Sequence, residues 1–193
     1  PDAAASGSRV VADEQAVVDG SDIVYVTTWT SEHERLVDMC IAAGKPFFCE
    51  KPLSTGLEGA ARMTERAAAS GLTHQCGLIL RRSPAYLLAR ELIADRASGG
   101  VMAVVFRDDQ FIPVQGHYGS TWRGDVKKAG AGTLLEHSIH DVDMLRFLAD
   151  DVTDVSARAT YAHGLPGIDD SVAASVGFAN GAVGTLTTVW HDN

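Results

Sequence analysis

Residues 23–49 read IVYVTTWTSEHERLVDMCIAAGKPFFC, and the pattern in this stretch decides the fold class. Residues 23–27 are apolar and β-branched on both faces, which is typical of a buried parallel strand. A helix is predicted from Thr30 or Ser31, which can cap it, to Gly44, which can end it. Residues 45–49 then form a second short strand. Strand, helix and strand in this order predict a right-handed βαβ unit.

A third cycle of the same pattern follows, and after it the pattern changes. A helix is predicted over residues 57–69 and a strand within 72–80, so the first segment belongs to a doubly wound parallel sheet. The later elements are predicted as helices over 84–97 and 133–148 and as strands over 101–106, 152–162, 171–178 and 182–190. The fold class is therefore α/β, with a second α+β domain built on an open, mostly antiparallel sheet.

Composition restricts the possible partners. The formal net charge is −9, from 16 basic and 25 acidic side chains without a basic block, which argues against nucleic acid or an anionic membrane. No apolar run approaches the roughly 20 residues of a membrane span. The three cysteines are odd in number and lie in apolar contexts, so we expect reduced thiols and a cytoplasmic location.

The dipeptide Glu50-Lys51 stands where the second strand ends. Ligands of doubly wound sheets bind beyond the carboxyl ends of the strands. A lysine held there, partly desolvated and oriented by a turn at Pro52, can donate or accept a proton. The alternative is a solvated surface pair, the commoner fate of an isolated Glu-Lys dipeptide.

Residues 130–143, GAGTLLEHSIHDVD, contain the second candidate group. Glu136 and His140 are four residues apart on the predicted helix, so both project from one face. An imidazole held by a carboxylate suits a proton shuttle near neutral pH. A capping cluster, a core histidine and a zinc site on His137 and His140 stay open as alternatives. The order E-H-x-x-H differs from the H-E-x-x-H of zinc peptidases.

Four segments, in this order along the chain, resemble the Gfo/Idh/MocA oxidoreductase family. They are VTTWTSEH at 26–33, AGKPFFCEKPL at 43–53, GLILRRSPAY at 77–86 and GAGTLLEHSIHDVD at 130–143. The resemblance implies that residues 1–80 are the C-terminal part of an NAD- or NADP-binding Rossmann domain. It implies that residues 81–193 are an incomplete α+β domain for substrate binding and oligomerisation. The implied reaction is hydride transfer between nicotinamide and a hydroxyl-bearing carbon of a sugar, inositol or related polyol.

The resemblance also implies roles for individual residues. Lys51 would hydrogen-bond the reacting hydroxyl, His140 would be the acid/base, and Glu136, where the family usually has Asp, would assist it. The positions implied on the cofactor side are Thr28, Trp29, His33, Glu50, Lys51 and Arg81. The positions implied for substrate binding are Trp122, Arg123 and His137. No metal is implied.

Two departures from the family pattern shape the remaining expectations. Trp29 stands where the family often has Pro, and no G-x-G-x-x-G fingerprint occurs between a strand and a helix. We therefore expect a fragment that lacks the N-terminal glycine fingerprint and the C-terminal end of the enzyme. We expect a homo-oligomer in which the open sheet pairs with a second subunit. The apolar face expected to pair consists of Val172, Val176, Val183, Leu186 and Val189. The alternative functions are a non-catalytic sensor or assembly module and a metal-dependent hydrolase using His137 and His140.

Overall fold

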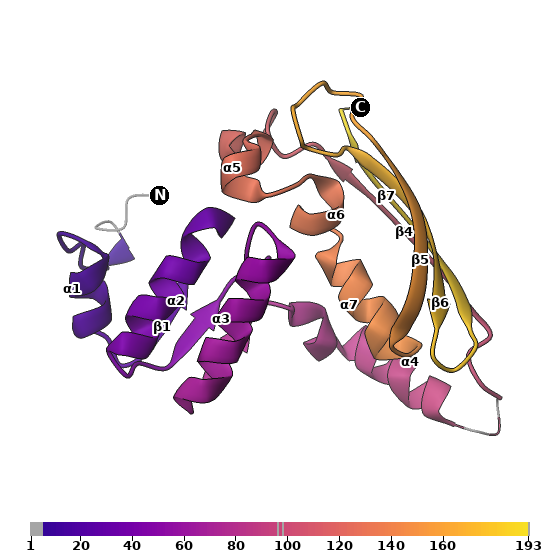
Figure 1. Ribbon diagram of the computed structural model, residues 1–193, viewed down its shortest axis with the longest axis horizontal. Helices are drawn as coiled ribbons and strands as arrows, with labels where there is room; N and C mark the ends of the chain where they lie inside the picture. The colour runs from indigo at the N-terminus through magenta and orange to yellow at the C-terminus, as the bar shows by residue number, and fades with distance from the viewer. Residues whose placement is uncertain (1–5, 96, 98, 193) are drawn as a thin grey trace. The chain divides into compact units, whose positions relative to one another are not determined.

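The computed structural model describes residues 6–95, 97 and 99–192. The chain forms two compact units, the first ending at Gly77 and the second beginning at Leu78, and each is described by itself. Figure 1 gives the element labels used below. In the part of the chain that the structure describes, no helix is long and apolar enough to cross a membrane.

The first unit contains a parallel sheet of three short strands. Its order is β1 (Val24–Val26), β2 (Phe47–Cys49), β3 (His74–Cys76), so β2 lies in the centre. Val26, Cys49 and Cys76 are register partners at the carboxyl ends of the three strands. The segments that follow the strands therefore leave the sheet at one edge, as the sequence predicted for a doubly wound fold.

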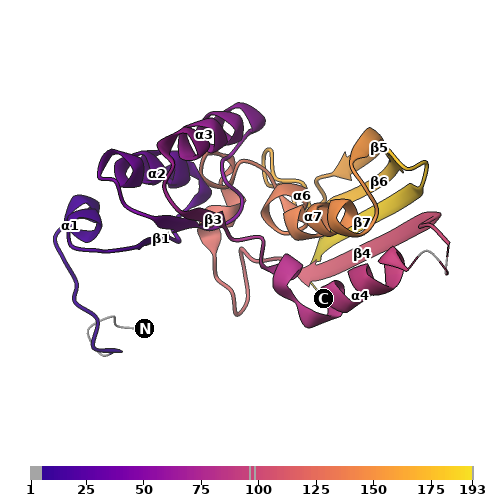
Figure 2. The same cartoon turned by 90° about the horizontal axis from the view of Figure 1, so that it is seen from below.

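Two helices cover one face of this sheet. They are α2 (His33–Ala42), which follows the short 3-10 helix η2 (Thr30–Glu32), and α3 (Leu57–Ser70) (Figure 2). Their apolar side chains pack with those of the strands in one core. A shorter helix, α1 (Glu14–Asp19), precedes β1. The opposite face of the sheet carries Tyr25, which is 69% exposed and whose ring lies beside that of Phe48.

The cysteines of the first unit are part of this core. Cys40 and Cys49 are buried, Cys76 is half-buried, and none of the three forms a disulfide. Burial raises the pKa of the Cys49 thiol to about 12, and the neighbouring Cys76 and Glu50 add smaller contributions in the same direction. The Cys49 thiol therefore stays protonated at neutral pH.

The second unit is built on a four-stranded mixed sheet. Its strands are β4 (Ala103–Phe111), β5 (Val152–Thr160), β6 (Ser171–Phe178) and β7 (Val183–His191). The spatial order is β4-β7-β6-β5; β4 pairs with β7 in parallel, and the other two pairings are antiparallel. The predicted fold class, a Rossmann-type parallel sheet followed by a mostly antiparallel one, is confirmed. β4 is longer than predicted, because it continues through the polar residues 107–110 to Phe111.

Helices of the second unit lie before β4 and between β4 and β5. Their bounds are η3 (Ile79–Arg82), α4 (Pro84–Ala94), η5 (Thr121–Gly124), α5 (Val126–Ala129), α6 (Thr133–Glu136) and α7 (Ile139–Leu148). The single helix predicted over 133–148 is therefore wrong: it is interrupted at His137 and Ser138. Both of their backbone N–H groups donate to the carbonyl of Thr133, at 3.1 and 2.8 Å, and the regular ladder restarts with α7.

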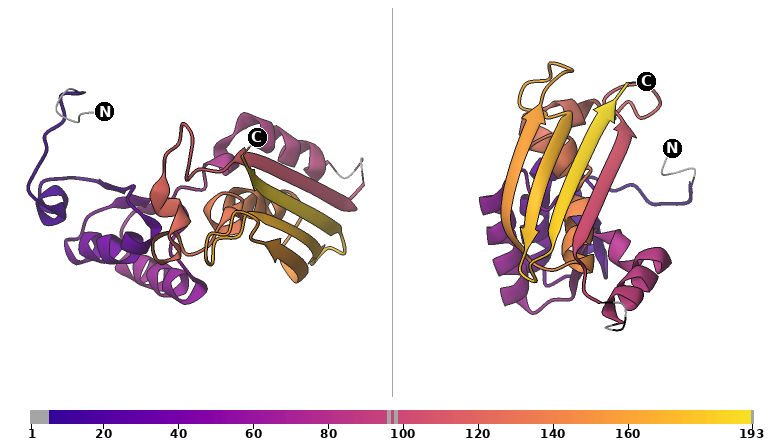
Figure 3. Two further views of the ribbon diagram at one scale, coloured as in Figure 1. Left: turned by 90° about the horizontal axis from the view of Figure 1, so that it is seen from above. Right: turned by 90° about the vertical axis from the view of Figure 1, so that its right-hand side faces the viewer.

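The four-stranded sheet has one covered and one open face, and its strands lie side by side in Figure 3. Side chains alternate between the faces along each strand. Val172, Val176 and Leu186 point to the covered face and are buried, and α7 packs there through Leu145. Val183, which is 62% exposed, points to the open face. The apolar set expected on one open face is thus wrong, because it joined residues from both faces.

The start of α6 is fixed by a close approach between two backbone segments. The Asp169 carboxylate accepts hydrogen bonds from the N–H groups of Gly132 (2.7 Å) and Leu134 (3.1 Å). The Asp169 carbonyl accepts from the N–H of Thr133 at 2.8 Å. A Cβ on Gly132 would lie 1.8 Å from that carbonyl oxygen. Only glycine can therefore occupy position 132 without moving the backbone.

Replacing Gly132 with Ala tests this packing. The added methyl group must displace the backbone of Asp169, so we expect Gly132→Ala to lower the free energy of unfolding by about 1–3 kcal/mol. Denaturation in urea, followed in the second unit by hydrogen exchange of the α6 amides, measures the loss. Gly100→Ala is the matched control, because a Cβ there meets no atom within 4 Å. Equal stability of the two variants would contradict the packing described for Gly132.

Candidate functional site

The first group of predicted site residues lies at the carboxyl edge of the parallel sheet. Thr28 and Trp29 follow β1 and are exposed, whereas Glu50 and Lys51 follow β2 and are half-buried. The backbone N–H of Glu50 donates to the Val26 carbonyl at 2.9 Å, which continues the strand pairing beyond β2. The structure thus brings four of the predicted residues together, on the edge where doubly wound sheets bind their ligands.

His33 ties the two loops of this edge together. The ring is 1% exposed; its Nδ1 lies 2.8 Å from the Pro52 carbonyl oxygen and its Nε2 lies 3.2 Å from that of Thr28. Since a carbonyl can only accept, a ring nitrogen that carries a proton donates to the carbonyl beside it. His33 therefore fixes the loop after β1 against the turn that carries Lys51. A direct contact of His33 with a cofactor stays a prediction.

Glu50 is held over the next strand. Its Oε2 accepts a hydrogen bond from the backbone N–H of Lys51 at 3.0 Å. A Cβ on Gly77, the residue after β3, would lie 2.6 Å from the same oxygen. The absence of a side chain at Gly77 thus makes room for the Glu50 carboxylate, which in turn fixes the backbone of Lys51. The Lys51–Pro52 peptide bond is cis.

The second group lies in the other unit and is centred on Glu136. The Glu136 side chain is 4% exposed, and its Oε1 accepts a hydrogen bond from Arg123 Nε at 2.8 Å. Arg123 Nη1 also donates to the hydroxyl of Ser120 at 2.6 Å, and the guanidinium lies 4.5 Å from the centre of the Trp122 ring. Two residues predicted as substrate contacts, Trp122 and Arg123, are thus joined to Glu136.

His137 and His140 stand at the interruption between α6 and α7. His137 Nε2 lies 2.7 Å from Asp108 Oδ2 of β4, and the backbone N–H of His140 donates to the His137 carbonyl at 3.4 Å. Because the helix is interrupted, the four-residue spacing of Glu136 and His140 is not the spacing of one regular helix. Asp108 escaped the sequence reasoning, since residues 107–110 gave no apolar alternation from which a strand could be recognised.

Asp141 lies beside Asp108 and is buried. Burial raises the pKa of the Asp141 carboxyl to about 6; a hydrogen bond with Ser138 opposes the rise, and the Asp108 carboxylate adds to it. Asp141 Oδ2 is buried without a hydrogen-bond partner. Two carboxyls so close together favour a proton on one of them.

A chain of buried hydroxyls connects the interrupted helix to the sheet. The Ser138 hydroxyl donates to Thr188 Oγ1 at 2.5 Å, and the hydroxyls of Thr188 and Thr133 are 2.8 Å apart. Thr188 is the register partner of Asp108 on the neighbouring strand. The sequence contains no signal for this arrangement, because the pairing of β4 with β7 joins residues 80 positions apart in the chain.

Arg81 is bound to α7. Its Nε and Nη2 both donate to the Asp143 carboxylate, at distances of 2.6 to 3.0 Å, so the pair is bidentate. The guanidinium also lies 5.4 Å from the centre of the Phe147 ring. Arg81 therefore fixes the segment before α4 to α7. Its predicted place on the cofactor side stays a prediction.

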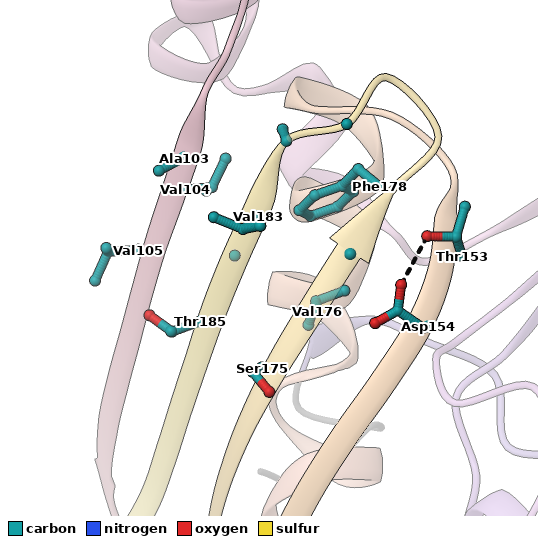
Figure 4. A pocket seen from close by; sticks show the side chains of 14 residues that line it. Ala103, Val104, Val105, Thr153, Asp154, Ser175, Val176, Phe178, Val183 and Thr185 are labelled. Atoms are coloured by element: carbon teal, nitrogen blue, oxygen red, sulfur yellow. Dashed lines mark hydrogen bonds between the residues drawn. The ribbon is translucent and has the colours of Figure 1, made fainter.

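A hollow of about 630 Å³ lies at one end of the four-stranded sheet (Figure 4). Its described lining is residues 103–105, 153–154, 175–178 and 181–185 and includes none of the predicted site residues. In Figure 4 the Thr153 hydroxyl points to the Asp154 carboxylate, to which it donates at 3.0 Å. Within residues 6–95, 97 and 99–192, no three His, Cys, Asp or Glu side chains are grouped so that they could hold a metal ion.

Replacing Asp141 with Asn tests the buried carboxyl pair. The folded state holds the Asp141 proton up to about pH 6, whereas the usual value is 3.8. The contribution of this proton to the free energy of unfolding is therefore fully present at low pH and is lost as the pH rises through about 6. An Asn cannot ionise, so Asp141→Asn should melt on the order of a few degrees above the wild type at pH 7.5 and level with it at pH 4.

Thermal melts at several pH values measure this difference. Asp143→Asn is the matched control, because it removes the acceptor of the Arg81 pair and should lower the melting temperature at pH 7.5. An Asp141→Asn variant that melts below the wild type at both pH values would contradict the raised pKa.

Comparisons with known proteins agree with this architecture. Residues 3–78 match the sequence model of the oxidoreductase family with an NAD-binding Rossmann fold, and residues 86–193 match that of the GFO/IDH/MocA C-terminal domain. The solved structure of GenD2 from gentamicin A biosynthesis, in complex with NAD, is similar with a TM-score of 0.88 and 26% identity; the match covers 97% of this chain and 54% of that one. Levoglucosan dehydrogenase in complex with NADH and levoglucosan gives a TM-score of 0.87 and 26% identity, covering 97% and 53%.

Curated relatives give the same result. 1,5-Anhydro-D-fructose reductase of Ensifer adhaerens is 31% identical over 92% of this chain and 53% of its own length. Inositol 2-dehydrogenase of Agrobacterium fabrum is 32% identical over 83% of this chain and 44% of its own length. The chain thus spans about half the length of the curated relatives it matches. Both family matches and these relatives together show that the chain belongs to the Gfo/Idh/MocA oxidoreductase family.

Proposed function

We propose that the chain carries the catalytic residues of an NAD- or NADP-dependent oxidoreductase that acts on a hydroxyl-bearing carbon of a sugar, inositol or related polyol. The observation that carries this proposal is the position of Lys51. It follows the central parallel strand β2, on a backbone fixed by Glu50 and by the contact of His33 with Pro52. Two side-chain interactions that order one turn are more than a solvated strand end requires.

The residues at the carboxyl edge of the parallel sheet suit a nicotinamide cofactor. Thr28 and Trp29 are exposed at the start of η2, where a hydroxyl and an indole can contact the cofactor, and Gly77 leaves the neighbouring position without a side chain. Solved relatives hold NAD or NADH, as GenD2 and levoglucosan dehydrogenase do. Nicotinamide, when bound, supplies the hydride acceptor or donor.

The chemistry left to the protein is the movement of a proton. In the oxidation direction the Lys51 ammonium donates a hydrogen bond to the oxygen of the reacting hydroxyl, and the His140 imidazole takes the hydroxyl proton. The proton returns from His140 in the reduction direction. Glu136 favours the protonated imidazole by its negative charge. An imidazole is suited to this exchange because its ordinary pKa lies near neutral pH.

The names of the relatives indicate the class of substrate. They refer to 1,5-anhydro-D-fructose, inositol and levoglucosan, so a sugar, an inositol or a related polyol is the class proposed here. Trp122 supports it, because an aromatic face beside the Arg123–Glu136 pair suits the C–H side of a carbohydrate ring. His137 is proposed as a further substrate contact, although its Nε2 lies against Asp108.

We also propose that the open face of the four-stranded sheet pairs with a second subunit. Val105 and Val183 are 80% and 62% exposed on this face, close to each other on the neighbouring strands β4 and β7. Exposed apolar side chains that adjoin across strands are typical of a surface covered in an assembly.

Removing the Lys51 ammonium tests the proposed function. In the longest natural protein that contains these residues, Lys51→Ala should lower kcat on the order of 10²-fold or more, as loss of a positioned acid/base does. The measurement is the absorbance of reduced nicotinamide during turnover of a panel of sugars and inositols with NAD and with NADP. Lys45→Ala is the matched control, because Lys45 precedes β2 at the opposite end of the strand. A Lys51→Ala enzyme as fast as the Lys45→Ala enzyme would refute the role.

A further inference from the structure

Arg123 is bound by the protein on three sides. Its Nε donates to Glu136 Oε1 at 2.8 Å, its Nη1 donates to Ser120 Oγ at 2.6 Å, and its guanidinium lies over the Trp122 ring. Ser120 and Trp122 belong to the turn around η5, whereas Glu136 ends α6. Because a guanidinium is planar and offers donors in a fixed fork, these contacts restrict its orientation strongly.

The Glu136 carboxylate depends on this contact. It is 4% exposed, and a carboxylate removed from water is unstable as an anion unless a cation and hydrogen-bond donors replace the water. Arg123 supplies both the charge and the donor. The side chain of Glu136 has three rotatable bonds, so the ion pair also selects one carboxylate position among several rotamers.

The backbone that carries Glu136 is fixed independently. Asp169 holds the N–H groups at the start of α6, and the Thr133 hydroxyl contacts that of Thr188 on β7. Glu136 is therefore anchored at its backbone by the sheet and at its carboxylate by Arg123. The Glu136 side chain links the two anchors.

We propose that Arg123 is a positioning residue, which keeps the buried Glu136 carboxylate charged and aimed so that it can act on His140. This inference rests on the proposed function and changes the role that the family resemblance implied for Arg123. Glu136 and Ser120 use two of the five guanidinium N–H groups, one on Nε and one on Nη1, and these two contacts set the orientation of the fork toward Glu136.

The first test does not depend on activity. Infrared spectra of the chain, with the glutamates labelled by ¹³C, report whether a buried carboxyl is protonated. Arg123→Met leaves Glu136 buried without its cation, so a carboxylic-acid carbonyl band should appear that the wild type lacks. The band should be missing from the double variant Arg123→Met/Glu136→Gln. Arg146→Met is the matched control, because Arg146 pairs with Asp151, whose side chain is 73% exposed. A spectrum of Arg123→Met without the band would overturn the proposal.

The second test measures catalysis in the longest natural protein that contains these residues. Arg123→Met should lower kcat about 10- to 100-fold, as misaimed catalytic groups do, and should leave KM within about threefold of the wild type. Added guanidinium chloride at low concentration should restore part of the rate in Arg123→Met and none in Arg146→Met. A raised KM with an unchanged kcat would show that Arg123 binds substrate, and would overturn the proposal.

Two further outcomes keep the inference separate from the proposed function. Arg123→Lys retains the positive charge without the planar fork of donors, and it replaces Arg123→Met if that variant does not fold. The Lys variant should then show a reduced kcat. Added guanidinium should not restore it, because the lysine side chain occupies the space of the guanidinium. A full-rate Lys variant would overturn the need for an aimed fork. If the wild type oxidises no polyol, the proposed function fails, and the infrared band alone decides whether Arg123 keeps Glu136 charged.

Discussion

The capture of three backbone N–H groups by Asp169 is the constraint on which the second unit depends. Its carboxylate and carbonyl hold residues 132–134 so closely that position 132 admits no side chain. This contact sets where α6 begins, and the hydroxyls of Ser138 and Thr188 set where it ends. Glu136, His137 and His140 all lie on or beside the short helix so defined. The positions of these side chains are therefore set by loop and strand residues that belong to no recognisable catalytic motif.

In the first unit, the turns at the ends of the strands are fixed in a different way. Its strands are only three residues long, and the turns beyond them are fixed by side chains that bond to the backbone. His33 connects the turns after β1 and β2, and the Glu50 carboxylate bonds to the backbone of Lys51 in the space left by the missing side chain of Gly77. The family resemblance placed both residues on the cofactor side. Their contacts in the chain show a second role, which is to order the backbone around Lys51.

The sequence predicted the elements whose causes are local. The strand at residues 23–27 and the glycine at the end of the following helix are written in neighbouring residues, and β1 and the end of α2 follow them closely. The cap predicted at Thr30 or Ser31 is wrong, because residues 30–32 form the 3-10 helix η2 and α2 begins at His33 without a side-chain cap. The interruption after Glu136 could not be predicted, because it depends on Thr188, 50 residues beyond Ser138. The parallel pairing of β4 with β7, which brings Asp108 beside Thr188, is also absent from local patterns. The sequence predicted Lys51, Glu136 and His140 as candidates, and Pro52 and Arg123 beside them. The contacts of Arg123 with Glu136 and of Pro52 with His33 were found only in the fold.

The proposed function assigns Lys51 and His140 to the same chemical step. A double-mutant cycle on kcat, with Lys51→Ala, His140→Ala and the double variant of the longest natural protein that contains these residues, tests it most directly. Groups that act as a unit are strongly non-additive, so the double variant should be about as slow as the slower single variant. Independent contributions would multiply. A double variant slowed by the product of the two single effects, or a single variant with the wild-type rate, would contradict this shared role of Lys51 and His140.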